Sequence, residues 1–356
     1  MLALIMAGGS GTRFWPRSRQ RHPKQLLRIY GDATMIQQTV QRLKPAVPPE
    51  KIFVVSTQIQ IDEIRRQLPD IPQENLLVEP VGKNTAPCIG LGALYMRRID
   101  PDGIMVVLPA DHMITQEEIW LQQLQQAELI ARETGALVTI GIRPTYPATG
   151  YGYIQHTHEK ITLDSVVAYR VKTFAEKPNY ETACRFLESG DFLWNSGIFV
   201  WKISTILQEI EEYLPEIADA LYTIDRAIGT DKEKETIDYT YRQIRSISID
   251  YGVMEHAREV YVLPGHFGWN DLGSWNEVYK IRPKDDHGNA TSGEHLLLDT
   301  EGCLVDVDGK VVATIGLKDM VIVDTEDALL ICPRDRAQDV RDIVEALKRK
   351  KLNHLL

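Results

Sequence analysis

Residues 2–18 read LALIMAGGSGTRFWPRS, a short apolar run followed directly by a loop with three glycines. The run at 2–6 has the composition of a buried strand in a parallel sheet. Gly8, Gly9 and Gly11 allow the backbone to turn sharply and to point N–H groups at a phosphate. This stretch therefore predicts an α/β fold that holds an anion after its first strand.

The loop matches neither of two common nucleotide-binding motifs. A dinucleotide fingerprint that begins with Gly9 and Gly11 needs glycine where Phe14 stands, and a Walker loop needs Gly-Lys followed by Ser or Thr. The chain has Arg13 instead, and later Pro-Lys-Gln at 23–25. Backbone donors with an arginine and a lysine suit a polyphosphate, whose transfer depends on positioning and charge neutralisation. The alternative interpretation is a glycine turn beside solvated cations.

The first 142 residues alternate β-branched runs with amphipathic stretches, which predicts a doubly wound, mostly parallel α/β sheet. We expect its strands at 2–6, 52–56, 76–79, 104–108 and 136–142. The helix before the last strand is expected to begin at a capping box of Thr115 and Glu118 and to end at Gly135. Its apolar face consists of Trp120, Leu124, Ala127 and Ala131.

The pattern becomes irregular between residues 150 and 201, which favours mixed strand pairing. Strands are expected at 166–174 and 197–202, with a helix near 180–188. A long helical region follows from Ser204 to about Gln243, with apolar residues near helical spacing.

A polar, turn-rich run at 283–289 marks the clearest linker. We therefore expect a first domain at 1–284 and a second domain at 285–356. In the second domain, apolar pairs recur between glycine and aspartate turn signals, which indicates a small β domain or a short β-solenoid. The chain ends in a helix whose apolar stripe consists of Val340, Ile343, Val344 and Leu347.

Composition narrows the class of partner. With 40 Lys and Arg against 50 Asp and Glu, the formal charge is -10, which argues against nucleic acid or an anionic membrane as the main partner. The longest apolar runs are far shorter than the ~20 residues of a membrane helix. Four widely spaced cysteines without a C-x-x-C motif indicate neither a disulfide framework nor a zinc site, so a reducing cytoplasm is expected.

A series of further motifs resembles the sugar-phosphate nucleotidyltransferases. The resemblance begins at the glycine loop and the Pro-Lys-Gln run and extends in order along most of the first 275 residues. The matching stretches are GGSGTR at 8–13, PKQ at 23–25, EPVGKNTAP at 79–87, LPADH at 108–112, GYGYI at 150–154, FAEKP at 174–178, WNSGIF at 194–199, SIDYGVME at 248–255 and WNDLGSW at 269–275.

In detail these motifs resemble the members of the family that use GTP and mannose 1-phosphate. The resemblance implies that the chain forms GDP-mannose and pyrophosphate from these two substrates with Mg²⁺, and it suggests a possible homodimer. Two alternatives stay open. One is a related nucleotidyltransferase that makes a dTDP- or UDP-sugar, and the other is a non-catalytic regulatory subunit that binds sugar nucleotides.

The resemblance also assigns roles to residues at the nucleotide. It implies that Arg13 and Lys24 are catalytic and stabilise the transition state and the leaving pyrophosphate. The residues implied to bind the nucleotide come from the glycine loop and the motif at 79–87, and they are Ala7, Gly8, Gly9, Gly11, Thr12, Glu79, Gly82, Asn84 and Thr85.

Asp111 follows the expected strand at 104–108, at the sheet edge where open α/β folds bind ligands. Mg²⁺ prefers carboxylates, waters and phosphates, so two aspartates from separate segments are a plausible site. The resemblance implies that Asp111 and Asp271 are the metal ligands. From the residues alone, Asp111 could equally cap the next helix.

A second group is implied to bind the sugar phosphate. The resemblance assigns Lys177 to the phosphate and Glu176 to the sugar hydroxyls, and the alternative is a surface ion pair between them. Asn195 and the backbone near Gly150 and Gly197 would bind the remaining hydroxyls, because an amide both donates and accepts.

Glu79 is our candidate for guanine recognition. Guanine presents an N1–H and an exocyclic amine on one edge, and a carboxylate accepts from both. The alternative is a strand-end charge in solvent, with guanine bound by backbone groups between Gly82 and Ala86.

Overall fold

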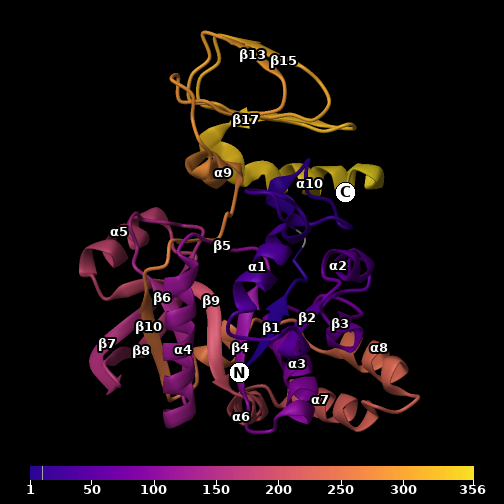
Figure 1. Cartoon of the computed structure of the whole chain (residues 1–356), viewed down its shortest axis with the longest axis vertical. Coiled ribbons are helices and arrows are strands. Elements are labelled where there is room, and N and C mark those ends of the chain that lie inside the picture. The colour runs from indigo at the N-terminus through magenta and orange to yellow at the C-terminus, as the bar shows by residue number, and fades with distance from the viewer. Residues whose placement is uncertain (10) are drawn as a thin grey trace. The chain divides into compact units, whose positions relative to one another are not determined.

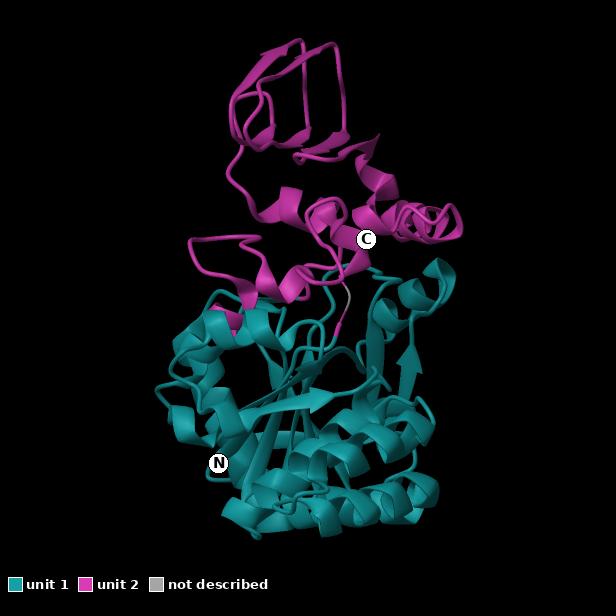
Figure 2. Cartoon of the chain, turned by 90° about the vertical axis from the view of Figure 1, so that its right-hand side faces the viewer, with its two compact units in different colours: residues 1–8, 40–270 teal, residues 9–39, 271–356 magenta. Residues whose placement is uncertain are grey.

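The structure is a computed structural model that describes residues 1–9 and 11–356. Its contacts divide the chain into two compact units, coloured teal and magenta in Figure 2. Unit 1 comprises residues 1–8 and 40–270, and unit 2 comprises residues 9–39 and 271–356. The glycine loop therefore passes from one unit into the other. The domain boundary expected near residue 284 stays a prediction.

Unit 1 is built on a nine-stranded sheet with the order β3-β2-β1-β4-β9-β6-β10-β8-β7 (Figure 1). One half of this sheet is parallel, because β1 pairs in parallel with β2 and β4, and β2 pairs in parallel with β3. Its strands are β1 (Leu2–Met6), β2 (Ile52–Thr57), β3 (Leu76–Glu79) and β4 (Ile104–Pro109). All four strands occur where the sequence predicted them.

The other half of the sheet is mixed, as the irregular pattern indicated. Strand β9 is antiparallel to β4, β6 and β7, whereas β6 and β10 are parallel. These strands are β6 (Leu137–Ile142), β7 (Gly152–Leu163), β8 (Val166–Glu176), β9 (Phe192–Lys202) and β10 (Val260–Gly265). A separate two-stranded sheet pairs β5 (Met113–Ile114) with β11 (Trp269–Asn270).

Helices of unit 1 cover the sheet and share a buried hydrophobic core with it. Leu2 and Leu4 on β1 alternate with their neighbours and pack with buried side chains of α3, α6 and α7. The expected long helical region is three helices, α6, α7 and α8. The helix bounds are α2 (Ile61–Gln67), α3 (Thr85–Ile99), α4 (Glu117–Thr134), α5 (Tyr180–Ser189), α6 (Ile203–Tyr213), α7 (Pro215–Ala227) and α8 (Glu233–Gln243), and α1 (Met35–Leu43) contains residues of both units.

The start of α4 differs from the expectation. Its N-cap is Gln116, without a side-chain cap, so the predicted box of Thr115 and Glu118 is wrong. The reason is that Thr115 N bonds to the carbonyl of Gly268, which continues the small β5–β11 sheet and delays the helix. The end was predicted correctly, because Gly135 is left-handed at φ 72°.

The C-terminal part of unit 2 is a β-solenoid, in which strands from successive turns pair in parallel. Residues of β12, β14 and β16 pair in parallel, as do β13 and β15, which lie side by side in Figure 1. The pairing confirms the predicted short β-solenoid. Its bounds are β12 (Ala290–Ser292), β13 (His295–Leu298), β14 (Leu304–Asp306), β15 (Val312–Ile315), β16 (Met320–Asp324) and β17 (Leu329–Pro333), with α9 (Trp275–Ile281) before it and α10 (Val340–Arg349) after it.

Residues 15–17, which follow the glycine loop, contact this β-solenoid and the adjoining helix α9 within unit 2. Buried Asp306 accepts from Arg17 Nε at 2.8 Å and forms an ion pair with Arg282 at 2.6 Å. Trp275 Nε1 donates to the carbonyl of Trp15 at 3.1 Å. These contacts fix residues 15–17 against the C-terminal elements of the same unit.

Two further features concern membrane helices and cysteines. In the part of the chain that the structure describes, no helix is both long and apolar enough to cross a membrane. The four cysteines are free, and Cys88 and Cys303 are buried.

Candidate active site

The glycine loop and the Pro-Lys-Gln run interlock within unit 2. Gly11 has φ 57°, and a Cβ there would lie 2.6 Å from Lys24 N, so both the backbone angle and the space require glycine. Ser18 Oγ donates to the Gly11 carbonyl at 2.7 Å, and Gln25 Nε2 donates to the Gly9 carbonyl at 3.0 Å. Side chains downstream of the loop therefore hold its carbonyl groups.

The two predicted catalytic cations differ in their surroundings. Lys24 is buried with 4% exposure, and its ammonium lies 5.5 Å from the centre of the Phe14 ring. Arg13 is partly exposed on the 3-10 helix Thr12–Phe14. Among the described residues Arg13 has neither a hydrogen-bond nor an ion-pair partner, so its guanidinium can bind an added phosphate.

Asp271 is brought to Lys24 in the same unit. The Lys24 ammonium donates to the backbone carbonyl of Asp271, so one lysine links the base of the glycine loop to a predicted metal ligand. Gly273 leaves space for the carboxylate, since a Cβ there would lie 2.9 Å from Asp271 Oδ2. The Asp271 side chain is partly exposed.

Asp111 belongs to unit 1, at the carboxyl end of β4. The preceding Ala110 N donates to the carbonyl of Met6 at 3.1 Å, which places this strand end beside the end of β1. Asp111 does not cap α4, whose N-cap is Gln116, so the alternative interpretation of Asp111 is wrong. Because Asp111 and Asp271 belong to different units, their pairing at one metal ion stays a prediction.

Glu79 is buried at the end of β3, with 3% exposure. Its Oε1 accepts from the hydroxyl of Tyr241 on α8, a residue that the sequence did not single out. A Cβ at Gly8 would lie 3.2 Å from Oε2, so the second oxygen faces the start of the glycine loop. Burial raises the pKa of Glu79 to about 7, and the Tyr241 hydrogen bond acts against this rise. The carboxyl is therefore not the solvated strand-end charge of the alternative interpretation.

Residues of the motif at 79–87 form the capped N-terminus of α3. Asn84, at φ 69°, caps α3 by accepting from Thr85 N at 2.9 Å. The Thr85 hydroxyl accepts from Ile249 N at 2.7 Å. These two predicted nucleotide residues thus have structural bonds, whereas Gly82 is exposed in the turn before them.

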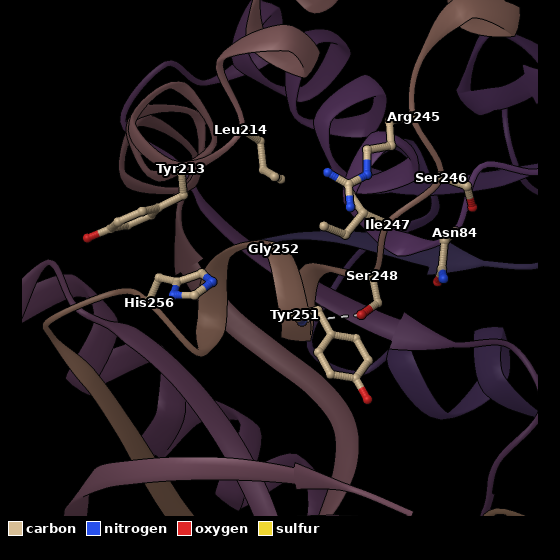
Figure 3. Close-up of a pocket in the computed structure, with 10 residues that line it drawn as sticks. All are labelled: Asn84, Tyr213, Leu214, Arg245, Ser246, Ile247, Ser248, Tyr251, Gly252 and His256. Carbon is tan, nitrogen blue, oxygen red and sulfur yellow. Dashed lines mark hydrogen bonds between the residues drawn. The ribbon is translucent and has the colours of Figure 1, made fainter.

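A cavity of about 580 Å³ lies beside this helix start (Figure 3). Of the predicted site residues only Asn84 lines it, and the segment Arg245–Ser248 forms one wall. Ile247 N donates to the carbonyl of Lys83 at 3.2 Å, and Ile247 O accepts from Ala86 N at 3.1 Å. The segment is therefore fastened to the start of α3.

The predicted sugar residues gather at the β7, β8 and β9 strands of unit 1. Gly152 is paired with Glu176, and a Cβ at Gly152 would overlap Glu176 Oε1 and lie 3.4 Å from Asn195 Cβ. Gly197, at φ 67°, donates from its N–H to Asn195 Oδ1 at 3.0 Å. Glu176, Asn195 and Gly197 therefore lie together. Gly150 is partly exposed in the turn before β7.

Lys177 is exposed and has φ 45°, so its backbone turns away from β8 directly after Glu176. Its ammonium lies 3.3 Å from Glu176 Oε2, which is the ion pair of the alternative interpretation. An exposed pair of this kind contributes little stability, so the lysine can exchange this partner for a phosphate.

Sequence reasoning missed Asp250, which accepts from Asn195 Nδ2 at 2.7 Å. Its motif at 248–255 was visible, but a single carboxylate in a helical stretch does not reveal its partner. Tyr151, in the motif at 150–154, packs against Trp194 and Trp269 at ring distances of 5.0 and 5.4 Å.

The raised pKa of Glu79 predicts a pH-dependent stability. Between its ordinary value of 4.5 and about 7, the unfolded carboxyl is ionised while the folded one stays protonated, so the folded state loses stability as the pH rises. Glu79→Gln should gain stability relative to wild type across this window, by at most about 3 kcal/mol. The measurement is chemical unfolding at pH 4.5 and 7.5, with Glu74→Gln as an exposed control. An equal stability difference at both pH values would contradict the burial argument.

Known proteins match the chain along almost its whole length. The family described as "Nucleotidyl transferase" matches residues 2–288, and the "MannoseP isomerase/GMP-like beta-helix domain" matches residues 293–347. The mannose-1-phosphate guanylyltransferase of Escherichia coli is 38% identical over 99% of this chain and 74% of that protein. The alginate biosynthesis protein AlgA of Pseudomonas syringae is 36% identical over 100% of this chain and 74% of that protein.

A solved structure extends the comparison to the fold. The protein described as mannose-1-phosphate geranyltransferase from Thermus thermophilus is 34% identical, with a TM-score of 0.86, over 98% of this chain and 99% of that one. These matches confirm the resemblance found in the sequence motifs. The chain belongs to the nucleotidyl transferase family.

Proposed function

We propose that this protein transfers a guanylyl group from GTP to mannose 1-phosphate, giving GDP-mannose and pyrophosphate. The names of its relatives support this choice within the family. The main structural support for this proposal is the close approach of Gly11 to Lys24. The Lys24 ammonium also donates to the backbone carbonyl of Asp271. Backbone donors beside a buried cation suit a triphosphate whose pyrophosphate must leave.

The reaction needs no covalent enzyme intermediate. A phosphate oxygen of mannose 1-phosphate forms a bond to the α-phosphorus of GTP, and the bond from this phosphorus to the bridging oxygen of pyrophosphate breaks in line. The sugar phosphate is already ionised at neutral pH, so the chain supplies no general base. Arg13 and Lys24 would neutralise charge that develops on the leaving pyrophosphate.

The residues present fit Mg²⁺. In the described part of the chain no three His, Cys, Asp or Glu side chains cluster as a protein metal cage. Mg²⁺ is commonly held by one or two carboxylates together with waters and phosphates, and Asp111 and Asp271 are partly exposed carboxylates of this kind. When bound, Mg²⁺ would stabilise negative charge on the α-phosphate.

The direct test measures pyrophosphate release over a grid of nucleoside triphosphates and hexose 1-phosphates with Mg²⁺. GTP with mannose 1-phosphate should give the highest kcat/KM. A higher value with dTTP or UTP would identify another member of the family, and no release with any pair would favour a regulatory subunit. The expected homodimer and cytoplasmic location stay predictions.

The metal proposal predicts the effect of neutralising each aspartate. Asp111→Asn and Asp271→Asn should each lower kcat by about a hundredfold or more, because each removes an anionic ligand from a preorganised electrostatic contact. EDTA should abolish activity reversibly. Asp70→Asn, at an exposed position, is the control for lost charge. Near-normal turnover of both variants at saturating Mg²⁺ would refute the assignment.

The two substrate sites are separated by a second variant. Lys177→Ala should raise the KM for mannose 1-phosphate at least about tenfold and leave the KM for GTP nearly unchanged, because the lost contact belongs to one ligand. Lys172→Ala, at an exposed position on the preceding strand β8, should change neither. If Lys177→Ala impairs GTP binding alone, the residue belongs to the nucleotide site instead.

Guanine selection is assigned to Glu79. Adenine presents an unprotonated N1 where guanine presents a donor, so a buried carboxylate would lose its partner, at a cost of ~1 to 3 kcal/mol. Glu79→Gln should narrow the advantage of GTP over ATP by roughly ten- to a hundredfold in kcat/KM. Tyr241→Phe removes the hydroxyl bound to Oε1 and keeps the carboxylate, so it is the matched comparison. An unchanged ratio in Glu79→Gln would place guanine recognition on the backbone between Gly82 and Ala86.

A further inference from the structure

The amide of Asn195 is held at both ends. Its Nδ2 donates to Asp250 Oδ1 at 2.7 Å, and its Oδ1 accepts from Gly197 N at 3.0 Å. A backbone N–H can only donate and an ionised carboxylate can only accept, so these partners determine which end of the amide is which. Each end retains one further hydrogen-bonding capacity, one N–H and one lone pair.

This fixed amide lies among the residues assigned to the sugar. The pairing of Gly152 with Glu176 places the Glu176 carboxylate beside Gly152, and Asn195 Cβ would be 3.4 Å from a Cβ at Gly152. Through its hydrogen bond to Asn195, Asp250 therefore belongs to the same group of residues as Glu176, although it lies on a different element of unit 1.

Asp250 is itself held firmly. It begins the π-helical turn Asp250–Met254, a kind of element that is frequent at functional sites. The preceding Ile249 N donates to the Thr85 hydroxyl, and Tyr251 N donates to Ser248 Oγ at 3.2 Å (Figure 3). The carboxylate is thus mounted between the start of α3 and the sugar residues of β9.

Burying a carboxylate at position 250 has a desolvation cost that a purely structural role does not explain. Burial raises the pKa of Asp250 to about 6, the hydrogen bond from Asn195 lowers it, and the nearby charge of Glu176 adds to the rise. A neutral acceptor would satisfy Asn195 with a smaller desolvation cost. The carboxylate instead gives a charge-assisted bond, which holds the amide in one orientation more strongly.

We propose that Asp250 is a positioning residue of the mannose 1-phosphate site, which orients the Asn195 amide so that its second N–H and second lone pair bind sugar hydroxyls. This role rests on the proposed function. Asp250 acts through Asn195, so it affects affinity for the sugar phosphate and leaves GTP binding intact.

Steady-state kinetics on Asp250→Ala, Asp250→Asn and Asn195→Ala test the proposal. Asp250→Ala should raise the KM for mannose 1-phosphate by about ten- to a hundredfold, with the KM for GTP within about twofold, because a polar contact to one ligand is lost. Asp250→Asn should recover most of the loss, since its amide oxygen can accept the same hydrogen bond. Glu255→Gln, an exposed carboxylate at the end of the same turn, should behave as wild type.

The double variant Asp250→Ala with Asn195→Ala identifies the route of action. If Asp250 acts through Asn195, the double variant has the KM of Asn195→Ala alone. Additive effects, an equal rise in the KM for GTP, or an Asp250→Asn variant as impaired as Asp250→Ala would each overturn the proposal. Should Asp250→Ala fail to fold, Asp250→Val, which fills more of the space but cannot accept a hydrogen bond, takes its place in the same cycle.

Failure of the proposed function is separable from failure of this role. If the wild type releases no pyrophosphate from GTP and mannose 1-phosphate, the proposed function fails. Calorimetric binding of GDP-mannose to the same variants then decides the role of Asp250, with the same expected order of affinities. A wild type that binds no GDP-mannose overturns both.

Discussion

The close approach of Gly11 to Lys24 is the constraint on which the candidate active site depends. A side chain at position 11 would overlap the backbone of Lys24 in a left-handed conformation that L residues rarely adopt. Lys24 itself is buried, and its ammonium donates to the backbone carbonyl of Asp271. The backbone angle at Gly11, the predicted catalytic cation Lys24 and the predicted metal ligand Asp271 are thus linked by contacts within unit 2.

In unit 1, by contrast, two carboxyl groups are buried beside neutral hydrogen-bond partners. Glu79 is held by the hydroxyl of Tyr241 and Asp250 by the amide of Asn195. The segment at 247–249 connects the two sites, since its backbone bonds to the start of α3 on one side and continues into Asp250 on the other. Both carboxyls have raised pKa values because they are withdrawn from water.

The sequence allowed prediction of the features that depend on local pattern. Each of these features is visible as a run or repeat within one contiguous stretch of sequence. They are the parallel strands β1 to β4, the glycine loop, the β-solenoid and the terminal helix. The start of α4 could not be predicted in this way, because Thr115 is engaged by Gly268, far away in the chain. Asp250 was missed for the same reason, since its partner is 55 residues away.

The residues predicted to bind the sugar illustrate why register matters more than composition. Motifs at 150–154, 174–178 and 194–199 were each visible, yet none indicates which of its residues face one another. The pairing of β7 with β8 sets Gly152 opposite Glu176, and the irregular pairing of β6 with β9 sets Gly141 opposite Asn195. A shift of one residue in either pairing would turn the side chain of Glu176 or Asn195 to the other face of the sheet. The binding chemistry of this half therefore depends on antiparallel registers that only the folded sheet defines.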